Sequence, residues 1–262
     1  MLYIVSTPIW NLEDITFRAV RTLKEANYIA CEDTRHSWLL LQKLEISARR
    51  IDEDWEERTK LISFHSYSDD TRVDKIMEIL REWKSVAVIS DAWTPWISDP
   101  AYELTSKARK EWIKIEPIPW CSAFLTALQW SWLPINRFTY LWFMPAKKWR
   151  EWFLKEILEW KDNTFVFYES VHRIKKLFEQ VKKVFWDDKK ILVARELTKR
   201  FEEFFYWNWD ECIKHFAHPK WEFVVVIDNS ESHNLKKKKE WKRIKEAEEN
   251  EKLMEDDEDK LI

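Results

Sequence analysis

Short apolar segments alternate with amphipathic segments along the first half of the chain. Five short runs are mostly apolar, as is typical of buried strands: 2–6, 28–31, 61–64, 85–89 and 113–116. Between them, apolar residues recur at helical spacing in segments 11–26, 34–44, 71–81 and 102–110. Asn11, with Asp14 three residues later, resembles a capping box and predicts that the first helix begins there. The alternation predicts a mostly parallel sheet with helices on both faces.

The second half continues this pattern after Pro134, which marks a boundary. Strands are expected at 138–143, 164–168, 191–194, around 203–206 and at 222–227, and helices at 150–159 and 172–184. We therefore expect an N-terminal α/β domain over 1–134, a C-terminal mixed α/β domain over 135–229 and a charged flexible tail over 230–262. The charge-dense stretch 47–60 predicts an exposed insertion.

Composition narrows the class of protein. Hydrophobic residues make up 45% of the chain and charged residues 35%, which suits a soluble protein with a buried core. The net charge of -3 means that any polyanionic partner must be bound by a local basic patch. We expect a cytoplasmic protein, because the chain shows no membrane span, no signal peptide and no CxxC among its three cysteines.

Glycine is absent from the chain, whereas tryptophan occurs 19 times. Average usage of ~7% predicts roughly 18 glycines in this length, so the surplus of one residue matches the deficit of the other. Several tryptophans also stand in turn-like contexts, such as 8–11, 82–85, 185–188 and 207–210. We hypothesise that a glycine codon, with UGA as the candidate, has been translated here as tryptophan. The alternative is a protein that is truly tryptophan-rich and free of glycine.

Two loops that follow predicted strands are candidates for a ligand site. They span residues 6–11 and 90–100, and ligands of open α/β sheets bind beyond the carboxyl ends of the strands. With glycine at positions 93 and 96, the second loop becomes a tight polar turn that a ligand can approach closely. With Trp93 and Trp96, two large indoles would crowd it. The alternative is an ordinary connection from strand to helix.

Six segments in order carry a family resemblance: 3–16, 31–36, 90–100, 119–123, 167–173 and 194–199. With glycine at 93 and 96, the chain resembles the bacterial 16S rRNA (cytidine-2'-O)-methyltransferases. These are tetrapyrrole-methylase-like, class III methyltransferases that depend on S-adenosylmethionine (SAM). The resemblance covers about residues 2–228, and Cys121 and Val171 replace prolines that we expect in the family.

The resemblance implies two α/β domains of the class III type with SAM in the cleft between them, usually in a homodimer. It implies methyl transfer, without a metal, to the ribose of a cytidine in the decoding region of 16S rRNA within the small ribosomal subunit. Carried over residue by residue, the implied SAM contacts are Pro8, Ile9, Asp91, Thr94, Ser122, Ala123, Tyr168, Ala194 and Trp221, the last being glycine in the restored sequence.

Methyl transfer needs alignment and an acceptor for the hydroxyl proton. Candidates for catalysis are Glu32, Asp33 and Lys199, although Glu32 and Asp33 can instead cap a helix. Candidates for RNA binding are Arg35, His36, His65, Arg173 and Arg195, any of which can instead be an ordinary surface or structural group. Basic groups at 147–150, 175–176, 182–183 and 199–200 either form a positive surface or lie on solvated helix faces.

Two other functions remain open from the sequence. The first keeps the fold and changes the substrate to a corrinoid precursor or to the diphthamide pathway. The second is a non-catalytic module that binds RNA or the ribosome, which becomes more favoured if the tryptophans are authentic, because they would fill the cofactor site. Binding of SAM separates the module from the enzymes.

Overall fold

The computed structural model describes residues 1–50, 59–64, 70–90, 101–119, 122–145, 148–160, 162–184, 191–216 and 221–229. Contacts divide the chain into two compact units. The first unit is Met1–Thr126 together with Glu196–Glu203, and the second is Ala127–Arg195 together with the residues from Phe204 onward. The expected boundary after residue 134 falls close to this division, whereas the expected tail from residue 230 lies outside the described residues.

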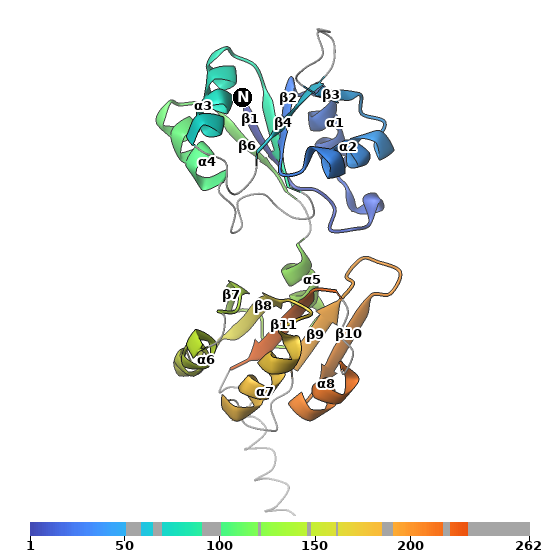
Figure 1. The fold of residues 1–262 in the computed structure, drawn as a ribbon, viewed down its shortest axis with the longest axis vertical. Helices are drawn as coiled ribbons and strands as arrows, with labels where there is room; N and C mark the ends of the chain where they lie inside the picture. The colour runs from blue at the N-terminus through green and yellow to red at the C-terminus, as the bar shows by residue number, and fades with distance from the viewer. Residues whose placement is uncertain are drawn as a thin grey trace, which may run out of the picture. The chain divides into compact units, whose positions relative to one another are not determined.

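The first unit contains a six-stranded sheet in the order β3-β4-β2-β5-β1-β6 (Figure 1). Its strands are β1 (Leu2–Val5), β2 (Tyr28–Cys31), β3 (Ala48–Arg50), β4 (Thr59–Ser63), β5 (Val86–Ile89) and β6 (Ile115–Ile118). Every pairing in it is parallel, as the alternating pattern predicts. β3 was not predicted, and it lies in the stretch that we expected to be an exposed insertion.

Helices cover both faces of this sheet, as predicted. They are α1 (Phe17–Glu25), α2 (Thr34–Lys43), α3 (Asp70–Arg81) and α4 (Ala101–Lys110). Strand β5 shows how one strand serves both faces: Val86 and Val88 pack with α3 and α4, while Ala87 and Ile89 pack with α1 and α2. Successive side chains of a strand point to opposite faces, so a strand buried on both faces must be apolar at every position.

The first helix begins later than predicted. Asn11 accepts a hydrogen bond from the Glu13 backbone N–H, but it opens only a short 3₁₀ turn, Leu12–Asp14. Ile15 is then extended, and Thr16 is the true cap of α1, accepting a 3.0 Å hydrogen bond from the Ala19 N–H. The prediction of one helix from residue 11 to 26 was therefore wrong, because two capping side chains compete for the start and both are used.

The second unit contains a five-stranded sheet in the order β10-β9-β11-β8-β7. Its strands are β7 (Phe138–Phe143), β8 (Thr164–Glu169), β9 (Ile191–Arg195), β10 (Glu203–Trp207) and β11 (Phe223–Asp228). The sheet is mixed, because β7 and β8 are parallel while β11 runs antiparallel to both β8 and β9.

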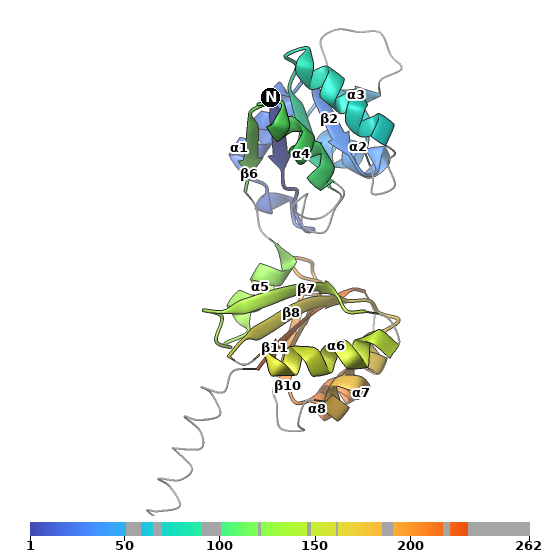
Figure 2. The same cartoon turned by 90° about the vertical axis from the view of Figure 1, so that its left-hand side faces the viewer.

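Three helices cover one face of the second sheet: α6 (Lys148–Glu159), α7 (Ile174–Val184) and α8 (Trp209–His215) (Figure 2). Their buried side chains form one cluster with those of the strands, and Phe178 and Trp209 are among its largest members. Helix α8 was not predicted, whereas α5 (Ala123–Trp130) begins where the resemblance implies a helix start, at Ser122 and Ala123.

Candidate functional site

The carboxyl edge of the first sheet gathers the first group of predicted site residues. Because the strands are parallel, the loops after β1, β2, β5 and β6 all leave from this edge. The Thr7 hydroxyl donates a 2.8 Å hydrogen bond to the Ser90 carbonyl, with both residues buried, and so ties the loop after β1 to the end of β5. Predicted Asp91, Thr94 and His65 lie outside the described residues.

Four of the predicted cofactor contacts stand at this edge. Pro8 and Ile9 are buried in the loop after β1. Ser122, also buried, precedes α5, and its carbonyl accepts a 3.0 Å hydrogen bond from the Thr126 N–H; Ala123 is the first residue of that helix. The structure thus holds these residues where parallel strands end, which is the place that the sequence predicts for a ligand.

Asp33 is the N-cap of α2. Its carboxylate accepts hydrogen bonds from the Arg35 backbone N–H at 2.8 Å and from two nitrogens of the Arg35 guanidinium at 3.1 and 2.8 Å. These bonds hold the pKa of the Asp33 carboxyl far below its usual range, which makes it a weak proton acceptor. The geometry therefore favours the capping role over the catalytic one. Glu32, half-buried after β2, keeps the catalytic prediction.

Arg35 and His36, both predicted to bind RNA, lie in the first turn of α2 and are exposed. The Arg35 guanidinium is engaged with Asp33 in the same turn. Its predicted role in RNA binding therefore competes with a local structural role, whereas exposure at least leaves His36 accessible.

The second group of predicted cofactor contacts lies at one edge of the second sheet. Tyr168 in β8 and Ala194 in β9 both stand beside Val224 of β11, one on each side. Trp221 precedes β11 at the same edge, because β11 runs antiparallel to its two neighbours. Residues from three separate parts of the sequence thereby meet at one edge of this sheet.

A buried ionic cluster lies beside this edge. The Glu169 carboxylate, fully buried, is 2.7 Å from the Arg173 Nε and 3.3 Å from a guanidinium nitrogen of buried Arg150. The two arginines also donate to backbone carbonyls of the loop after β7, Arg150 to Pro145 and Arg173 to Met144. Burial raises the pKa of Glu169, and the adjacent arginines act against this rise. Arg173, predicted to bind RNA, therefore has a structural role.

Residues 196–203, between β9 and β10, belong to the first unit by their contacts. The Lys199 ammonium is 2.6 Å from the Glu196 carboxylate and 3.9 Å from the centre of the Trp10 ring. The Thr198 hydroxyl accepts a 3.3 Å hydrogen bond from the Asn11 N–H. The predicted catalytic Lys199 is thus held against the loop after β1, among the first group of predicted residues.

A family model described as Tetrapyrrole (Corrin/Porphyrin) Methylases matches residues 1–212. The chain belongs to the tetrapyrrole methylase family. The resemblance inferred from the motifs and the predicted fold class are both confirmed.

Two relatives of this chain carry the name Ribosomal RNA small subunit methyltransferase I. The protein of Halalkalibacterium halodurans is 40% identical over 233 residues, covering 87% of this chain and 76% of that protein. The protein of Thermotoga maritima is 37% identical over 232 residues, covering 88% of this chain and 99% of that protein. Among solved structures, the methyltransferase CobJ aligns with a TM-score of 0.63 at 18% identity, over 87% of this chain and 93% of that chain. That likeness supports the fold alone.

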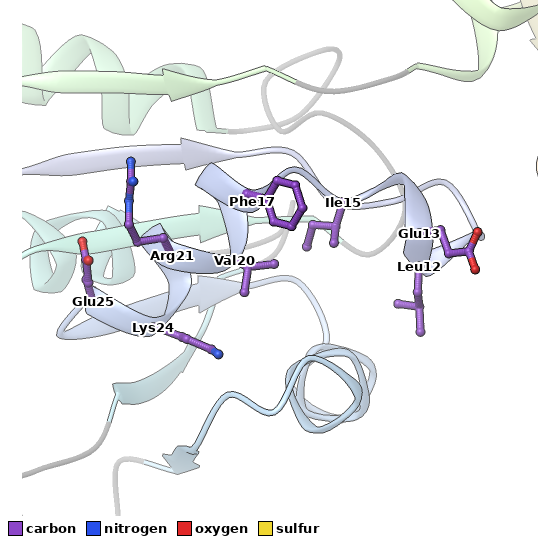
Figure 3. A pocket seen from close by; sticks show the side chains of 8 residues that line it. All are labelled: Leu12, Glu13, Ile15, Phe17, Val20, Arg21, Lys24 and Glu25. Carbon is purple, nitrogen blue, oxygen red and sulfur yellow. The ribbon is translucent and has the colours of Figure 1, made fainter.

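A pocket of about 610 Å³ lies on the first unit of this family member (Figure 3). It is lined by Leu12, Glu13, Ile15, Phe17, Val20, Arg21, Lys24 and Glu25. None of these is a predicted site residue. Within the described ranges, no group of three or more His, Cys, Asp or Glu side chains is placed to hold a metal ion. None of the described helices is long and apolar enough to cross a membrane.

Two residues at the site were not predicted from the motifs. Glu169 and Glu196 both lie inside quoted motifs, yet no role was assigned to either. Each forms a close ion pair with a predicted site residue, Arg173 and Lys199 respectively. The one available signal was proximity in sequence: each carboxylate precedes its partner by three or four residues, a spacing at which side chains meet in turns and helices. Arg195, predicted to bind RNA, places its guanidinium 5.7 Å from the centre of the Phe216 ring.

Replacing Asp33 with Asn is expected to leave methyl transfer within about twofold of the parent, because Asn caps a helix as well as Asp does. Loss of a general base would instead lower turnover by about 10²–10⁴-fold. Single-turnover methylation assays on parent, Asp33→Asn and Asp33→Ala chains separate the two roles. A loss of a hundredfold in Asp33→Asn with normal SAM affinity would restore Asp33 as the proton acceptor.

Proposed function

We propose that this chain transfers a methyl group from SAM to the ribose 2'-hydroxyl of a cytidine in the decoding region of 16S rRNA. The observation that carries the proposal is the identity of 37–41% to proteins named Ribosomal RNA small subunit methyltransferase I, over 77–88% of this chain. The alternative of a corrinoid or diphthamide substrate is not favoured. The solved structures of cobalamin and porphyrin methylation enzymes are 15–18% identical to this chain and share its fold only.

The residues expected to hold SAM fit that ligand in kind. Ile9 and Ala194 offer buried apolar surface, Tyr168 an aromatic ring and Ser122 a buried hydroxyl, a mixture suited to a ligand with apolar and polar parts. When bound, SAM supplies an electrophilic methyl group on a sulfonium, and the neutral thioether left after transfer is a good leaving group. Trp221 departs from the fit, since a large side chain stands where the family has glycine. We expect no metal, and the cleft between two domains remains a prediction.

The chain must align the ribose hydroxyl and remove its proton. Lys199 can stabilise the negative charge that develops on the 2'-oxygen, because its ammonium is a compact cation held near the loop after β1. Glu32 is the remaining carboxylate candidate for proton acceptor at the end of β2. Pro8 and Ile9 shape the loop that faces the same edge of the sheet.

The RNA partner requires a positive surface in spite of the net charge of -3. Helix α7 presents Lys175, Lys176 and Lys183 away from its buried face, and all three are exposed. Lys182 is engaged in a 2.7 Å ion pair with Asp210. We assign the three exposed lysines to phosphate contacts in the small ribosomal subunit. A homodimer and a cytoplasmic location accompany this function as expectations.

Methyl transfer to small ribosomal subunits that lack the modification tests the proposal. The given chain and a variant with glycine at positions 10, 93, 96 and 221 are incubated with labelled SAM, and the RNA is digested for nucleoside mass analysis. We expect 2'-O-methylcytidine, with the glycine variant more active because its cofactor loops are less crowded. Binding of SAM by calorimetry without any methylated ribose would move the substrate elsewhere. Failure of both chains to bind SAM would favour a non-catalytic module.

A further inference from the structure

Glu196 is a buried carboxylate whose neighbour is a predicted catalytic group. Glu196 is 9% exposed, and its Oε1 lies 2.6 Å from the Lys199 Nζ. The Lys199 N–H also donates a 2.9 Å hydrogen bond to the Glu196 carbonyl, so backbone and side chain hold the same short turn. A lysine side chain has four rotatable bonds, and a partly buried ion pair restricts where its ammonium can lie.

The turn around this pair has a costly backbone. Glu196 and Thr198 have φ of 54° and 64°, in the left-handed region that disfavours residues with a Cβ. Neither is a tryptophan, so the conformation at these two positions does not depend on how the glycine-free composition arose. Glu202 stabilises the turn, because its carboxylate accepts a 2.7 Å hydrogen bond from the Thr198 N–H. Such backbone conformations gather at functional sites, where the surroundings maintain them.

We propose that Glu196 is the positioning residue of Lys199, holding the ammonium where charge develops on the ribose oxygen. The inference rests on the proposed methyl transfer. The ion pair fixes one side of the ammonium, and the Trp10 ring at 3.9 Å covers another. If position 10 is glycine, that second side opens toward substrate while the ion pair is unchanged. Glu196 therefore acts through Lys199 and does not itself touch the reacting atoms.

A double-mutant cycle tests this role. Glu196→Gln is expected to lower the single-turnover rate by about tenfold with unchanged SAM affinity, since a misplaced cation stabilises the transition state less. In a chain that already carries Lys199→Met, the same change should have no further effect. Glu202→Gln is the matched control: its carboxylate accepts from the Thr198 backbone N–H in the same turn rather than from the Lys199 ammonium, and its rate should stay within about threefold. Multiplicative losses in the double variant would overturn the proposal.

A second readout does not depend on activity. Competitive acetylation, followed by peptide mass analysis, measures how reactive the Lys199 amine is. We expect Lys199 to react faster in Glu196→Gln than in the parent or in Glu202→Gln, because its partner carboxylate is lost. Equal reactivity of Lys199 in the parent and both variants would show that the ion pair with Glu196 does not hold the ammonium, and would overturn the proposal. If the parent makes no 2'-O-methylcytidine while acetylation shows the pair, the proposed function fails and the positioning contact stands.

An independent observation concerns the tryptophans. In the described part of the chain, nine non-glycine residues have positive φ, and five of them are tryptophans with φ of 55–68°. The five are Trp83, Trp112, Trp132, Trp142 and Trp221. Glycine is the residue that adopts this region freely, whereas the Cβ of tryptophan clashes there.

Two of these positions are helix ends of a well-known geometry. After α4, the Trp112 N–H donates to the Arg109 carbonyl at 3.1 Å and the Ile113 N–H to the Ala108 carbonyl at 2.9 Å, which together form a Schellman motif. After α3, the Trp83 N–H donates in the same way to the Leu80 carbonyl. Glycine is the usual residue at this place. Trp83 and Trp112 are 95% and 94% exposed, so their indoles gain almost nothing from packing.

The other three positions also suit glycine. Trp142 lies where the register between β7 and β8 shifts, and a left-handed glycine is typical of one class of β-bulge. Trp132 follows α5, and Trp221 precedes β11; both are exposed. Trp209 is the contrast: it is helical, fully buried and packed against Phe178. Tryptophans thus separate into those that the backbone disfavours and one that the core requires.

We also infer that the protein made by its source carries glycine at positions 83, 112, 132, 142 and 221, read from a codon that is here translated as tryptophan. The gene and the native protein test this. We expect one shared codon at the five positions, UGA, and the ordinary tryptophan codon at position 209. Peptides from source cells should show glycine at the five positions and tryptophan at 209. Tryptophan at position 83 or 112, or glycine at 209, would overturn the inference.

Discussion

Replacing Trp83, Trp112, Trp132, Trp142 and Trp221 together with glycine is expected to raise the free energy of unfolding by about 3–5 kcal/mol. Each left-handed residue with a Cβ costs roughly 1–2 kcal/mol. At each position, the extra conformational freedom of glycine in the unfolded chain offsets about 0.4–1 kcal/mol of that gain. The sum is a large part of the ~5–15 kcal/mol that stabilises a typical domain. Urea unfolding of the parent and of the variant with all five substitutions measures this difference in the free energy of unfolding.

The same substitution at Trp209 is the matched control. Trp209 is fully buried against Phe178, and loss of a buried aromatic side chain costs about 3–5 kcal/mol. Tryptophan-to-glycine changes are therefore expected to stabilise at positive φ and to destabilise in the core. If the variant with all five substitutions is no more stable than the parent, the backbone is unstrained at these positions.

Replacing Arg150 with Met is expected to destabilise the second unit by about 3–5 kcal/mol, the usual cost of removing one partner of a buried ion pair. The change leaves the Glu169 carboxylate buried with one arginine, Arg173, beside it, and it also removes the hydrogen bond from Arg150 to the Pro145 carbonyl. Chemical denaturation of single variants gives the loss. Lys155→Met on the same helix is the control: its ion pair with Glu151 is exposed, so a change of less than about 1 kcal/mol is expected.

The pH dependence of the stability of the Arg150→Met variant identifies the cause of its destabilisation. Burial already raises the pKa of Glu169, and loss of an adjacent cation raises it further. A carboxyl whose pKa is higher in the folded state loses stability as pH rises from its unfolded pKa, about 4.3, through its folded pKa. The deficit of the variant should therefore shrink on acidification and be largest at pH values above the folded pKa of Glu169. A deficit independent of pH would indicate lost packing rather than an uncompensated charge.

Much of the fold could be predicted because its strands and helices have clear periodicity. β2 and β7 match the predicted segments residue for residue. The errors have local physical causes. Two capping residues, Asn11 and Thr16, divide the expected first helix into a turn and a helix. Helix α8 is only seven residues long, too short to show a helical repeat.

The predicted site divides in the same way. Motif order identified residues such as Tyr168 and Ala194, which the sheet register then places on either side of one strand. Sequence alone could not distinguish a capping carboxylate from a catalytic one at Asp33, because the distinction lies in how Arg35 folds back. Nor could it assign Glu196, whose role depends on burial and on a 2.6 Å contact with Lys199.

The central place of β1 has a consequence for synthesis of the chain. β1 contains residues 2–5 but pairs with β5 and β6. Leu2 therefore cannot form its strand pairings until Val86 and Ile115 have been synthesised. The segment Glu196–Glu203, which belongs to the same unit, emerges from the ribosome still later. The amino-terminal unit thus cannot be completed as it is translated, and its apolar first strand stays unpaired on both sides until β5 and β6 have been made. We expect nascent chains to depend on chaperones over this interval, although the unit that needs them is synthesised first.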